Sequence, residues 1–178
     1  MKEKYIIEKA KIENINDILD IVKDAKELLR KQNTDQWCGD YPNYNTFLED
    51  IKNNVLYVLK DNDIICGVSV ISKEIDHNYD NIYEGNWLSN HNDKYVVIHR
   101  IAIKKEYYGK NLSKYFFDYA LSYALKNNIY SLRVDTHEKN LAMQKALNKV
   151  GFIKCGVIYL ARNDEGTNKR IAFEKVIK

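Results

Sequence analysis

The sequence predicts an α/β protein: a mixed, twisted and largely antiparallel sheet of about seven strands, flanked by about four helices. Two observations support this class. Apolar, β-branched runs of strand length are interspersed with segments whose apolar residues recur at helical spacing. In order, these segments predict a strand, two helices, a hairpin and a long irregular stretch, followed by strand, helix, strand, helix and two closing strands. Such mixed connections predict mostly antiparallel pairing, with parallel pairing where a helix crosses between two strands.

Length and composition favour one globular domain over residues 1–178. The chain is 45% apolar and 12% aromatic, which is enough to bury a core of ordinary size. Its 28 basic and 25 acidic residues are nearly balanced, and the basic residues occur in scattered pairs rather than in a stripe. This charge pattern does not predict a nucleic-acid partner.

The sequence shows no recognisable targeting segment, membrane span or metal-binding motif. No apolar run reaches the length of a membrane span, and the N-terminus has no apolar core with a small-residue cleavage site. The three cysteines Cys38, Cys66 and Cys155 show no paired spacing, so we expect a reducing cytoplasm and no disulfide framework. His77, His91 and Cys38 lack metal-ligand spacing, and no metal is expected.

The N-terminal half is expected to open with a strand followed by a helix that Asn14 or Asn16 caps and that ends near Lys31. The helix carries apolar residues along one face. The other elements of this half, in chain order, are Tyr5–Ala10 (the opening strand), Asn45–Asn53 (helix), Val55–Leu59 (strand) and Ile64–Ile71 (its hairpin partner, in which Gly67 predicts a bulge or a close approach).

Two loops carry more aromatic residues than a solvated linker would. In Gln32–Asn43, Trp37 and Tyr41 either pin the loop to the core or form the wall of a substrate pocket. The second loop, His77–Asp93, is the longest irregular segment, and loops of this length in a compact domain are usually functional or disordered. Its aromatic residues argue against disorder.

The stretch Tyr95–Asn127 predicts an anion site. A β-branched run from Val96 to Ile103 is typical of a buried strand, a polar loop with one glycine follows, and an amphipathic helix comes next. The first amides of a helix have no internal partner, and the helix dipole favours negative charge there. The remaining expected elements are Ser131–Thr136 (strand), Asn140–Val150 (helix, ended by Gly151), Phe152–Leu160 (strand), Arg162–Lys169 (turn with Gly166) and Arg170–Val176 (strand).

Three parts of the chain together resemble the GNAT superfamily of acyl-CoA-dependent N-acyltransferases. They are IHRIAIKKEYYGKNLSKYF, which is similar to the family's pyrophosphate loop, DTHEKNLAMQKALNKVGF from Asp135 to Phe152, and the closing CGVIYL with RIAFEK. The resemblance runs from about Tyr5 to the end of the chain. It implies acetyl-CoA as cosubstrate and a primary amine on a small molecule or a peptide as acceptor. Separately, the excess of aromatic residues would suit the contact face of a homodimer.

The resemblance also implies which residues bind the cofactor. The strand before the loop supplies a backbone amide for the developing oxyanion and an edge for the pantetheine arm. The family's loop usually reads Arg or Gln, Gly, any residue, Gly, any residue, Gly or Ala, and Tyr108, Asn111 and Ser113 depart from it. Asn tolerates positive φ well, so Asn111 can keep the turn, and Ser113 can serve as a cap. The implied cofactor-binding set is Ile101, Ala102, Ile103, Tyr108, Gly109, Lys110, Asn111, Leu112, Ser113 and Asn140.

Candidates for proton transfer are less clearly marked. His99 lies on the strand and is either a base, since the unperturbed pKa of a free histidine suits proton transfer near neutrality, or a structural residue of the sheet. Strict strand alternation would place its side chain with Val97, Ile101 and Ile103, but a bulge would change that. Tyr159 is a candidate acid for the thiolate, although a tyrosine packed on the sheet with its hydroxyl satisfied is the favoured interpretation. Leu147 stands where many family members have a tyrosine, so that family role does not carry over. Lower-ranked alternatives are Glu84 as a base and His137 at a strand end.

The acceptor is only weakly encoded. Asp76, Asp80, Glu84 and Asp93 make the long irregular segment acidic, which suits a cationic amine. The residues expected to bind substrate are Trp37, Tyr41, Glu84 and Trp87, the aromatic ones by cation–π contacts. The competing interpretations are a non-catalytic module that binds acyl-CoA and, less favoured, a structural domain without a ligand.

Overall fold

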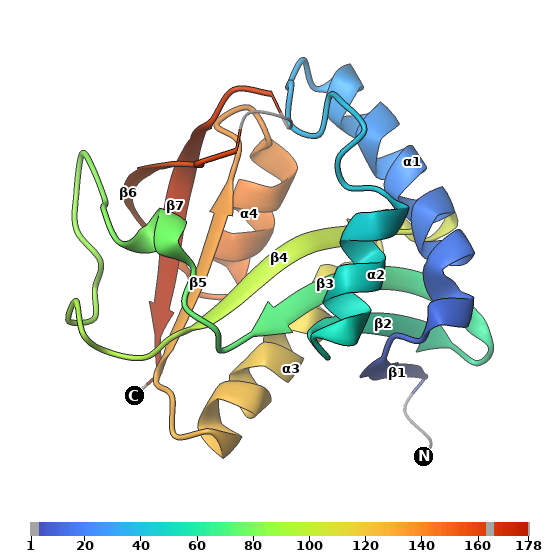
Figure 1. Cartoon of the computed structure of the whole chain (residues 1–178), viewed down its shortest axis with the longest axis horizontal. Helices are drawn as coiled ribbons and strands as arrows, with labels where there is room; N and C mark the ends of the chain where they lie inside the picture. The colour runs from blue at the N-terminus through green and yellow to red at the C-terminus, as the bar shows by residue number, and fades with distance from the viewer. Residues whose placement is uncertain (1–3, 163–165, 178) are drawn as a thin grey trace.

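The computed structural model describes residues 4–162 and 166–177, which include a seven-stranded sheet with helices on both faces (Figure 1). The strand order is β1-β2-β3-β4-β5-β7-β6. Neighbouring strands pair antiparallel except β4 and β5, which pair parallel. The mixed, largely antiparallel α/β sheet predicted from the sequence is confirmed.

The seven strands are β1 (Tyr5–Lys9), β2 (Leu56–Asp61), β3 (Ile64–Ser72), β4 (Val96–Ile103), β5 (Ser131–Thr136), β6 (Ile153–Tyr159) and β7 (Lys169–Val176). The α-helices are α1 (Ile15–Lys31), α2 (Tyr44–Lys52), α3 (Ser113–Lys126) and α4 (Leu141–Lys149). Short 3-10 helices occur at Ile12–Asn14, His77–Tyr79 and Lys105–Tyr107. The predicted turn Arg162–Lys169 lies partly outside the described residues.

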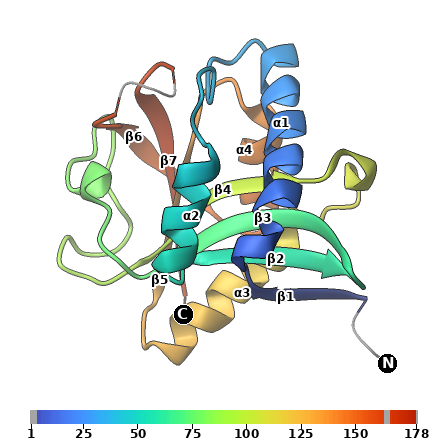
Figure 2. The same cartoon turned by 45° about the vertical axis from the view of Figure 1, so that its right-hand side comes forward.

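The two faces of the sheet are covered differently (Figures 1 and 2). Helices α3 and α4 pack on one face, where Phe116, Phe117 and Leu147 join the largest apolar cluster. Helices α1 and α2 cover the β2–β4 half of the other face. The β5–β7–β6 half of that face is covered by the β3–β4 loop, residues 73–95, which contributes Tyr79 and Tyr95 to a third cluster. Helices α1 and α2 therefore pack on one half of the second face, and the β3–β4 loop packs on the other half.

The β3–β4 loop is tied to the sheet by a buried ion pair. Glu174 of β7 is fully buried and accepts hydrogen bonds from the loop amides of Leu88 and Ser89 and from the Ser131 hydroxyl. Arg133 of β5 donates its Nε to Glu174 across 3.2 Å, and its guanidinium lies 4.1 Å from the centre of the Trp87 ring. These contacts show that the longest irregular segment is ordered by buried charge and aromatic packing.

Strand β4 contains a bulge that determines on which face of the sheet each of its side chains lies. Ala102 pairs with Val68 and His99 pairs with Val70, so Arg100 and Ile101 together stand opposite the single residue Ser69. As a result Ala102 packs under α1 and α2, whereas Ile101 and Ile103 pack on the α3 face. The strict alternation of His99 with Ile101 and Ile103 is therefore wrong, because the bulge at Arg100 inserts one extra residue.

Beyond Val97, β4 and β5 part. Their pairs are Val96 with Leu132 and Val97 with Arg133, although β4 runs on to Ile103 and β5 to Thr136. Figure 1 shows the two strands running in different directions from there. The result is a cleft in the middle of the sheet at the carboxyl ends of two parallel strands, the position at which α/β sheets commonly bind ligands.

Of two local predictions, the one for Asn14 needs refinement and the one for Gly67 does not. Asn14 precedes α1, but its side chain accepts from the amide of Lys11 and not from an amide of the helix. A Cβ on Gly67 would lie 3.0 Å from the Ile103 side chain, and the β2–β3 register also shifts beside this residue. Both expectations for Gly67, a bulge and a close approach, are thus confirmed.

Candidate active site

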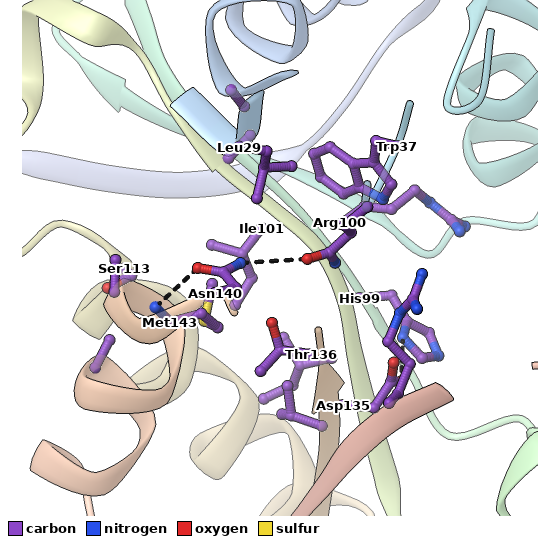
Figure 3. Close-up of a pocket in the computed structure, with 18 of the residues that line it drawn as sticks. Leu29, Trp37, His99, Arg100, Ile101, Ser113, Asp135, Thr136, Asn140 and Met143 are labelled. Carbon is purple, nitrogen blue, oxygen red and sulfur yellow. Dashed lines mark hydrogen bonds and ion pairs between the residues drawn. The ribbon is translucent and has the colours of Figure 1, made fainter. Parts of the chain in front are cut away.

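A cavity of about 490 Å³ occupies the cleft between β4 and β5. One wall comes from α1 and the α1–α2 loop, and the opposite wall comes from the start of α3 and from α4. Figure 3 shows Ser113, Asn140 and Met143 on one side of this cavity and His99 with Asp135 on the other. A single cavity therefore joins the predicted pyrophosphate loop to the predicted base.

His99 lies between two carboxylates that come from different elements. Its Nε2 is 2.8 Å from Oδ2 of Asp76 in the β3–β4 loop, and its Nδ1 is 3.7 Å from Oδ1 of Asp135 on β5. The hydrogen bond to Asp76 assigns the proton of the neutral ring to Nε2, since a carboxylate accepts. Nδ1 is then left as a proton acceptor facing Asp135 inside the cavity.

Both carboxylates are held in place. Asp76 also accepts hydrogen bonds from the amide and the side chain of Asn78, and Asp135 accepts one from the Tyr79 hydroxyl at 2.6 Å. Burial raises the pKa of Asp76, but the hydrogen bonds from His99 and Asn78 outweigh it, and the pKa lies below its usual value. Burial and the neighbouring Asp135 raise the pKa of Tyr79 well above the usual value. Asp76 is therefore an anion beside His99 at neutral pH.

The backbone of β4 turns donors toward the cleft. The Lys104 amide donates to Cys66 of β3, and Ala102 pairs with Val68 in the same ladder. Because the backbone groups of an antiparallel strand alternate in direction, the amides of Ile101 and Ile103 point away from β3 and toward β5. There β5 has already diverged, so these two amides face the cavity.

The loop before α3 has the backbone expected of an anion site. Gly109 and Asn111 have φ of 78° and 57°, and space for a Cβ at Gly109 is open. Within the first turn, the amide of Lys114 donates to the carbonyl of Asn111 and that of Tyr115 to the carbonyl of Leu112. The amides of Leu112, the N-cap residue, and Ser113, the first helical residue, precede these two and lack an intrahelical partner, as is general at a helix start, so they are positioned for an anion.

The side chains of this loop have different roles. Tyr108 and Ser113 line the cavity, whereas Leu112 is only 3% exposed and packs in the core below α3. Leu112 is also the N-cap residue of α3, and no side chain caps this helix with a hydrogen bond. Ser113 is already inside the helix, so its expected capping role is wrong. The Lys110 ammonium lies 4.4 Å from the centre of the Tyr107 ring.

Asn140 bridges the two walls of the cleft at the start of α4. Its Oδ1 accepts from the amide of Met143 at 3.2 Å, which caps the helix, and its Nδ2 donates to Gln36 of the α1–α2 loop at 3.3 Å (Figure 3). Asn140 lines the cavity, as do Met143 and Gln36. Its side chain is thus fixed from two directions.

The aromatic residues of the α1–α2 loop form part of the cavity wall. Trp37 and Tyr41 are each 6% exposed, pack against Leu29 of α1 and line the cavity. The guanidinium of Arg162 lies 3.6 Å from the centre of the Tyr41 ring. The loop is therefore anchored in the core and also forms part of the cavity wall, and its role in substrate binding stays a prediction.

Three loops contact one another beside the cavity-lining residues Gln36 and Thr136. Asp35 of the α1–α2 loop accepts from the amide of Thr167 in the β6–β7 connection at 2.7 Å. Its Oδ1 lies 3.0 Å from Nε2 of His137, which follows β5. A Cβ on Gly166 would come within 2.2 Å of the Asp35 carbonyl oxygen, so only glycine allows this approach.

Burial and then Arg170 lower the pKa of His137, although Asp35 acts in the opposite direction.

Three predicted site residues lie elsewhere. Tyr159 is 43% exposed and packs edge-on against Tyr83 at the outer strand β6. Glu84 is exposed, with its carboxylate 3.9 Å from Lys169. Trp87 donates to the Tyr79 carbonyl and belongs to the loop anchor described above. None of the three lines the cavity.

Other residues at the site were not predicted as functional. Asp135, Tyr79 and Arg162 are brought to the cavity or its edge by strand pairing and loop packing over long sequence separations. Of these three, only Asp135 could have been recognised from the sequence. It lies near the carboxyl end of a strand that was expected to pair parallel with the strand of His99. In residues 4–162 and 166–177, no group of three or more His, Cys, Asp or Glu is placed to hold a metal ion. None of the helices in this part of the chain is both long and apolar enough to cross a bilayer.

Comparisons with known proteins agree with this geometry. The family model described as Acetyltransferase (GNAT) family matches residues 22–152. A GNAT-family acetyltransferase structure from Streptococcus agalactiae is 31% identical, with a TM-score of 0.86 over 98% of this chain and 96% of that one. A putative acetyltransferase from Staphylococcus aureus is 29% identical, with a TM-score of 0.72 over 97% of this chain and 99% of that one.

A more distant structure shares the fold. It is yncA, a putative acetyltransferase from Salmonella typhimurium, with its cofactor acetyl-CoA, and it is 10% identical with a TM-score of 0.68 over 99% of this chain and 95% of that one. A search of curated proteins found no match.

Proposed function

Since the chain belongs to the GNAT acetyltransferase family, we propose that it transfers an acetyl group from acetyl-CoA to a primary amine, with His99 as the general base. The observation that carries this proposal is the placement of His99. His99 lines the cavity with its Nδ1 on the side of Asp135, and the same cavity borders the outward-facing amides of β4 and reaches the start of α3. A base, oxyanion donors and an anion site thus share one cleft.

The donors along the cleft support acetyl-CoA as the cofactor. The exposed amides around Gly109 and Asn111 and at the start of α3 would hold the pyrophosphate, and the edge of β4 at Ile101 and Ile103 would pair with the pantetheine arm. Ser113 and Met143 line this end of the cavity. Bound acetyl-CoA supplies the activated acetyl thioester that an amine can attack.

His99 is suited to remove the proton that keeps the acceptor unreactive. An alkyl ammonium group has a pKa of about 10.4, so it must lose a proton before it can act as a nucleophile. Nδ1 of His99 takes this proton, while Asp76 holds the opposite nitrogen and fixes the ring. The imidazolium that results lies between two carboxylates, because Asp135 is 3.7 Å from Nδ1. Its charge is thereby stabilised as it forms.

The amides of β4 supply the complementary stabilisation. Ile101 and Ile103 direct N–H groups into the cleft, and preformed backbone donors stabilise negative charge on a carbonyl oxygen without reorganising. Tyr159 is too far out on β6 to take part, so the proposal assigns no side-chain acid to the departing thiolate. Leu147, which stands where many family members have a tyrosine, is fully buried in the core below the cleft.

We expect the acceptor to be cationic. Asp76 and Asp135 line the cavity on either side of His99, and Trp37 and Tyr41 add aromatic surface, while Arg100, Arg162 and Arg170 line the same cavity with their charges partly engaged by protein groups. The two carboxylates and the two aromatic side chains together suit an ammonium group through charge and cation–π contacts. Glu84 and Trp87, which lie outside the cavity, are left out of this substrate set.

The test is the release of free thiol from acetyl-CoA with a panel of amines that includes monoamines, diamines, amino acids and peptide N-termini. We expect thiol release that depends on both reactants and is faster for amines with a second positive charge. Tight binding of acetyl-CoA in a calorimeter with no turnover across the panel would favour a non-catalytic acyl-CoA-binding module. The absence of any acetyl-CoA binding would overturn both readings.

A further inference from the structure

A buried ion pair lies at the bulge of β4, where Arg100 and the nearby Tyr41 also line the cavity. The Arg100 guanidinium donates Nε to Oδ2 of Asp50 at 3.0 Å and Nη2 to Oδ1 at 2.6 Å, which is a two-pronged pair. Its Nη1 donates to the Tyr41 hydroxyl at 2.5 Å. Asp50 belongs to α2 and is 7% exposed. All three nitrogens of Arg100 are therefore engaged by α2 and the loop before it.

The backbone of Arg100 is in an unfavourable conformation. Its φ is 53°, in the left-handed region that non-glycine residues avoid, and it lies in the middle of a strand. Such a conformation persists only where surrounding contacts impose it. Helix α2 lies across β4 here (Figures 1 and 2), and the two-pronged pair is the contact that connects the helix to this residue.

The bulge determines the direction of the next amides. It moves Ile101 and Ile103 to the α3 face and leaves their N–H groups directed at the cleft. Without the extra residue, β4 beyond His99 would change register by one against β3, and each N–H of this segment would point the opposite way. The proposed oxyanion donors therefore depend on a backbone geometry at Arg100.

We propose that Asp50 and Tyr41 are positioning residues that act through Arg100. They hold the guanidinium, the guanidinium keeps residue 100 in the left-handed conformation, and that conformation aims the Ile101 amide at the reacting carbonyl. The inference rests on the proposed function for its catalytic part, but not for its structural part. It assigns a role in catalysis to α2, an element that contributes no residue to the cavity wall.

Glycine gives a sharp test, because it adopts the left-handed conformation without help. The double variants Asp50→Asn/Arg100→Ala and Asp50→Asn/Arg100→Gly both remove the ion pair and leave no unpaired buried charge. We expect kcat to fall by about 100-fold or more in the alanine variant, the loss typical of a misplaced oxyanion donor. The kcat of the glycine variant should be at least about tenfold higher than the kcat of the alanine variant. The KM for acetyl-CoA should be nearly equal in these two variants.

Two further measurements separate positioning from simple loss of stability. Val58→Ala removes methyl groups from the same core under α1 and α2, away from the cavity, and should lower the melting temperature while leaving kcat unchanged. Crystal structures of the two double variants should show the β3–β4 register intact with glycine at position 100 and altered with alanine. This structural readout needs no activity.

The outcomes are distinct. Equal kcat in the alanine and glycine variants, or an unaltered bulge in both, would overturn the inference. An equal loss of kcat in Val58→Ala would also overturn it, because stability alone would then explain the effect. If the wild-type protein shows no turnover, the proposed function fails, and the register in the two double variants still decides the structural claim.

Discussion

His99 is oriented by residues that lie far from it in the sequence. Asp76 comes from the β3–β4 loop, Asp135 from β5, and Tyr79 holds Asp135 in turn. A histidine in the middle of a strand could equally be a structural residue, and the sequence left that choice open. The two flanking carboxylates and the cavity at Nδ1 are what favour the base.

Asp76→Asn should slow catalysis without preventing binding. The variant removes the negative charge that fixes the ring tautomer, so we expect kcat/KM to fall by about 10–100-fold, less than for loss of the base itself. Acetyl-CoA affinity should stay close to wild type. The matched control is Asp80→Asn, because Asp80 pairs with His77 at 2.9 Å on the same loop but outside the cavity. Equal effects of the two substitutions would contradict the assignment.

His137 should make the protein less stable in mild acid. Its Nδ1 accepts a hydrogen bond from the Lys139 amide at 3.0 Å, and burial is the main cause of its lowered pKa. The unfolded chain therefore binds a proton more readily below about pH 6.5, and the free energy of unfolding falls as the pH drops below that value. One such group can contribute at most about 1.4 kcal/mol per pH unit.

Urea unfolding at about pH 7.5 and about pH 5.5 checks this prediction. Wild type should lose more stability between the two values than His137→Gln. His77→Gln serves as the control, because the His77 side chain is 84% exposed. A loss in His137→Gln as large as in wild type would show that the pH dependence arises from another group.

At the scale of elements, the unit β4–loop–α3 carries most of the proposed chemistry. The order of its parts was predicted well, because hydrophobic periodicity and one glycine mark the strand, the turn and the helix. The face that each strand residue presents was not predicted. A bulge depends on contacts with α2 and β3, such as the Ser69 hydroxyl that donates to the His99 carbonyl at 3.2 Å.

Asn111 should matter for its backbone and not for its amide group. Its φ is 57°, which glycine adopts freely and a β-branched residue resists. Asn111→Gly should keep the Kd for acetyl-CoA within about twofold, whereas Asn111→Val should pay about 1–2 kcal/mol and weaken binding by roughly 5–30-fold. Calorimetric titration measures both. Equal affinities in the two variants would show that the turn does not need a left-handed residue.

At the scale of the whole molecule, the site depends on how the β3–β4 loop is attached. The fold class could be read from the order and spacing of the elements. The positions of Tyr159, Glu84 and Trp87 could not, because strand order and the path of a long loop are set by tertiary packing. The loop brings Asp76 to His99 but uses Trp87 to enclose Arg133, and this division of roles within one segment has no local sequence signal.

Glu174→Gln should detach this loop and destabilise the protein. The carboxylate is fully buried, and its hydrogen bonds with Ser131 and Ser89 together with Arg133 outweigh burial and keep its pKa below the usual value. Removing its charge leaves Arg133 buried without a counterion, which typically costs about 3–5 kcal/mol. Urea unfolding should show this loss, and amide exchange in residues 73–95 should become faster.

Ser131→Ala is the milder comparison, because it removes only one hydrogen bond to the same carboxylate. It should cost about 1 kcal/mol. If Glu174→Gln costs no more than Ser131→Ala, the buried pair is not what holds the loop.

The central claim is that His99 is the base of an acetyl-CoA-dependent acetyl transfer. The measurement that tests it most directly compares thiol release and acetyl-CoA affinity in wild type, His99→Gln and the control His77→Gln. The account predicts that His99→Gln lowers kcat/KM by about 10²–10⁴-fold while its Kd for acetyl-CoA stays near that of wild type, and that the control matches wild type. Full activity in His99→Gln would contradict it.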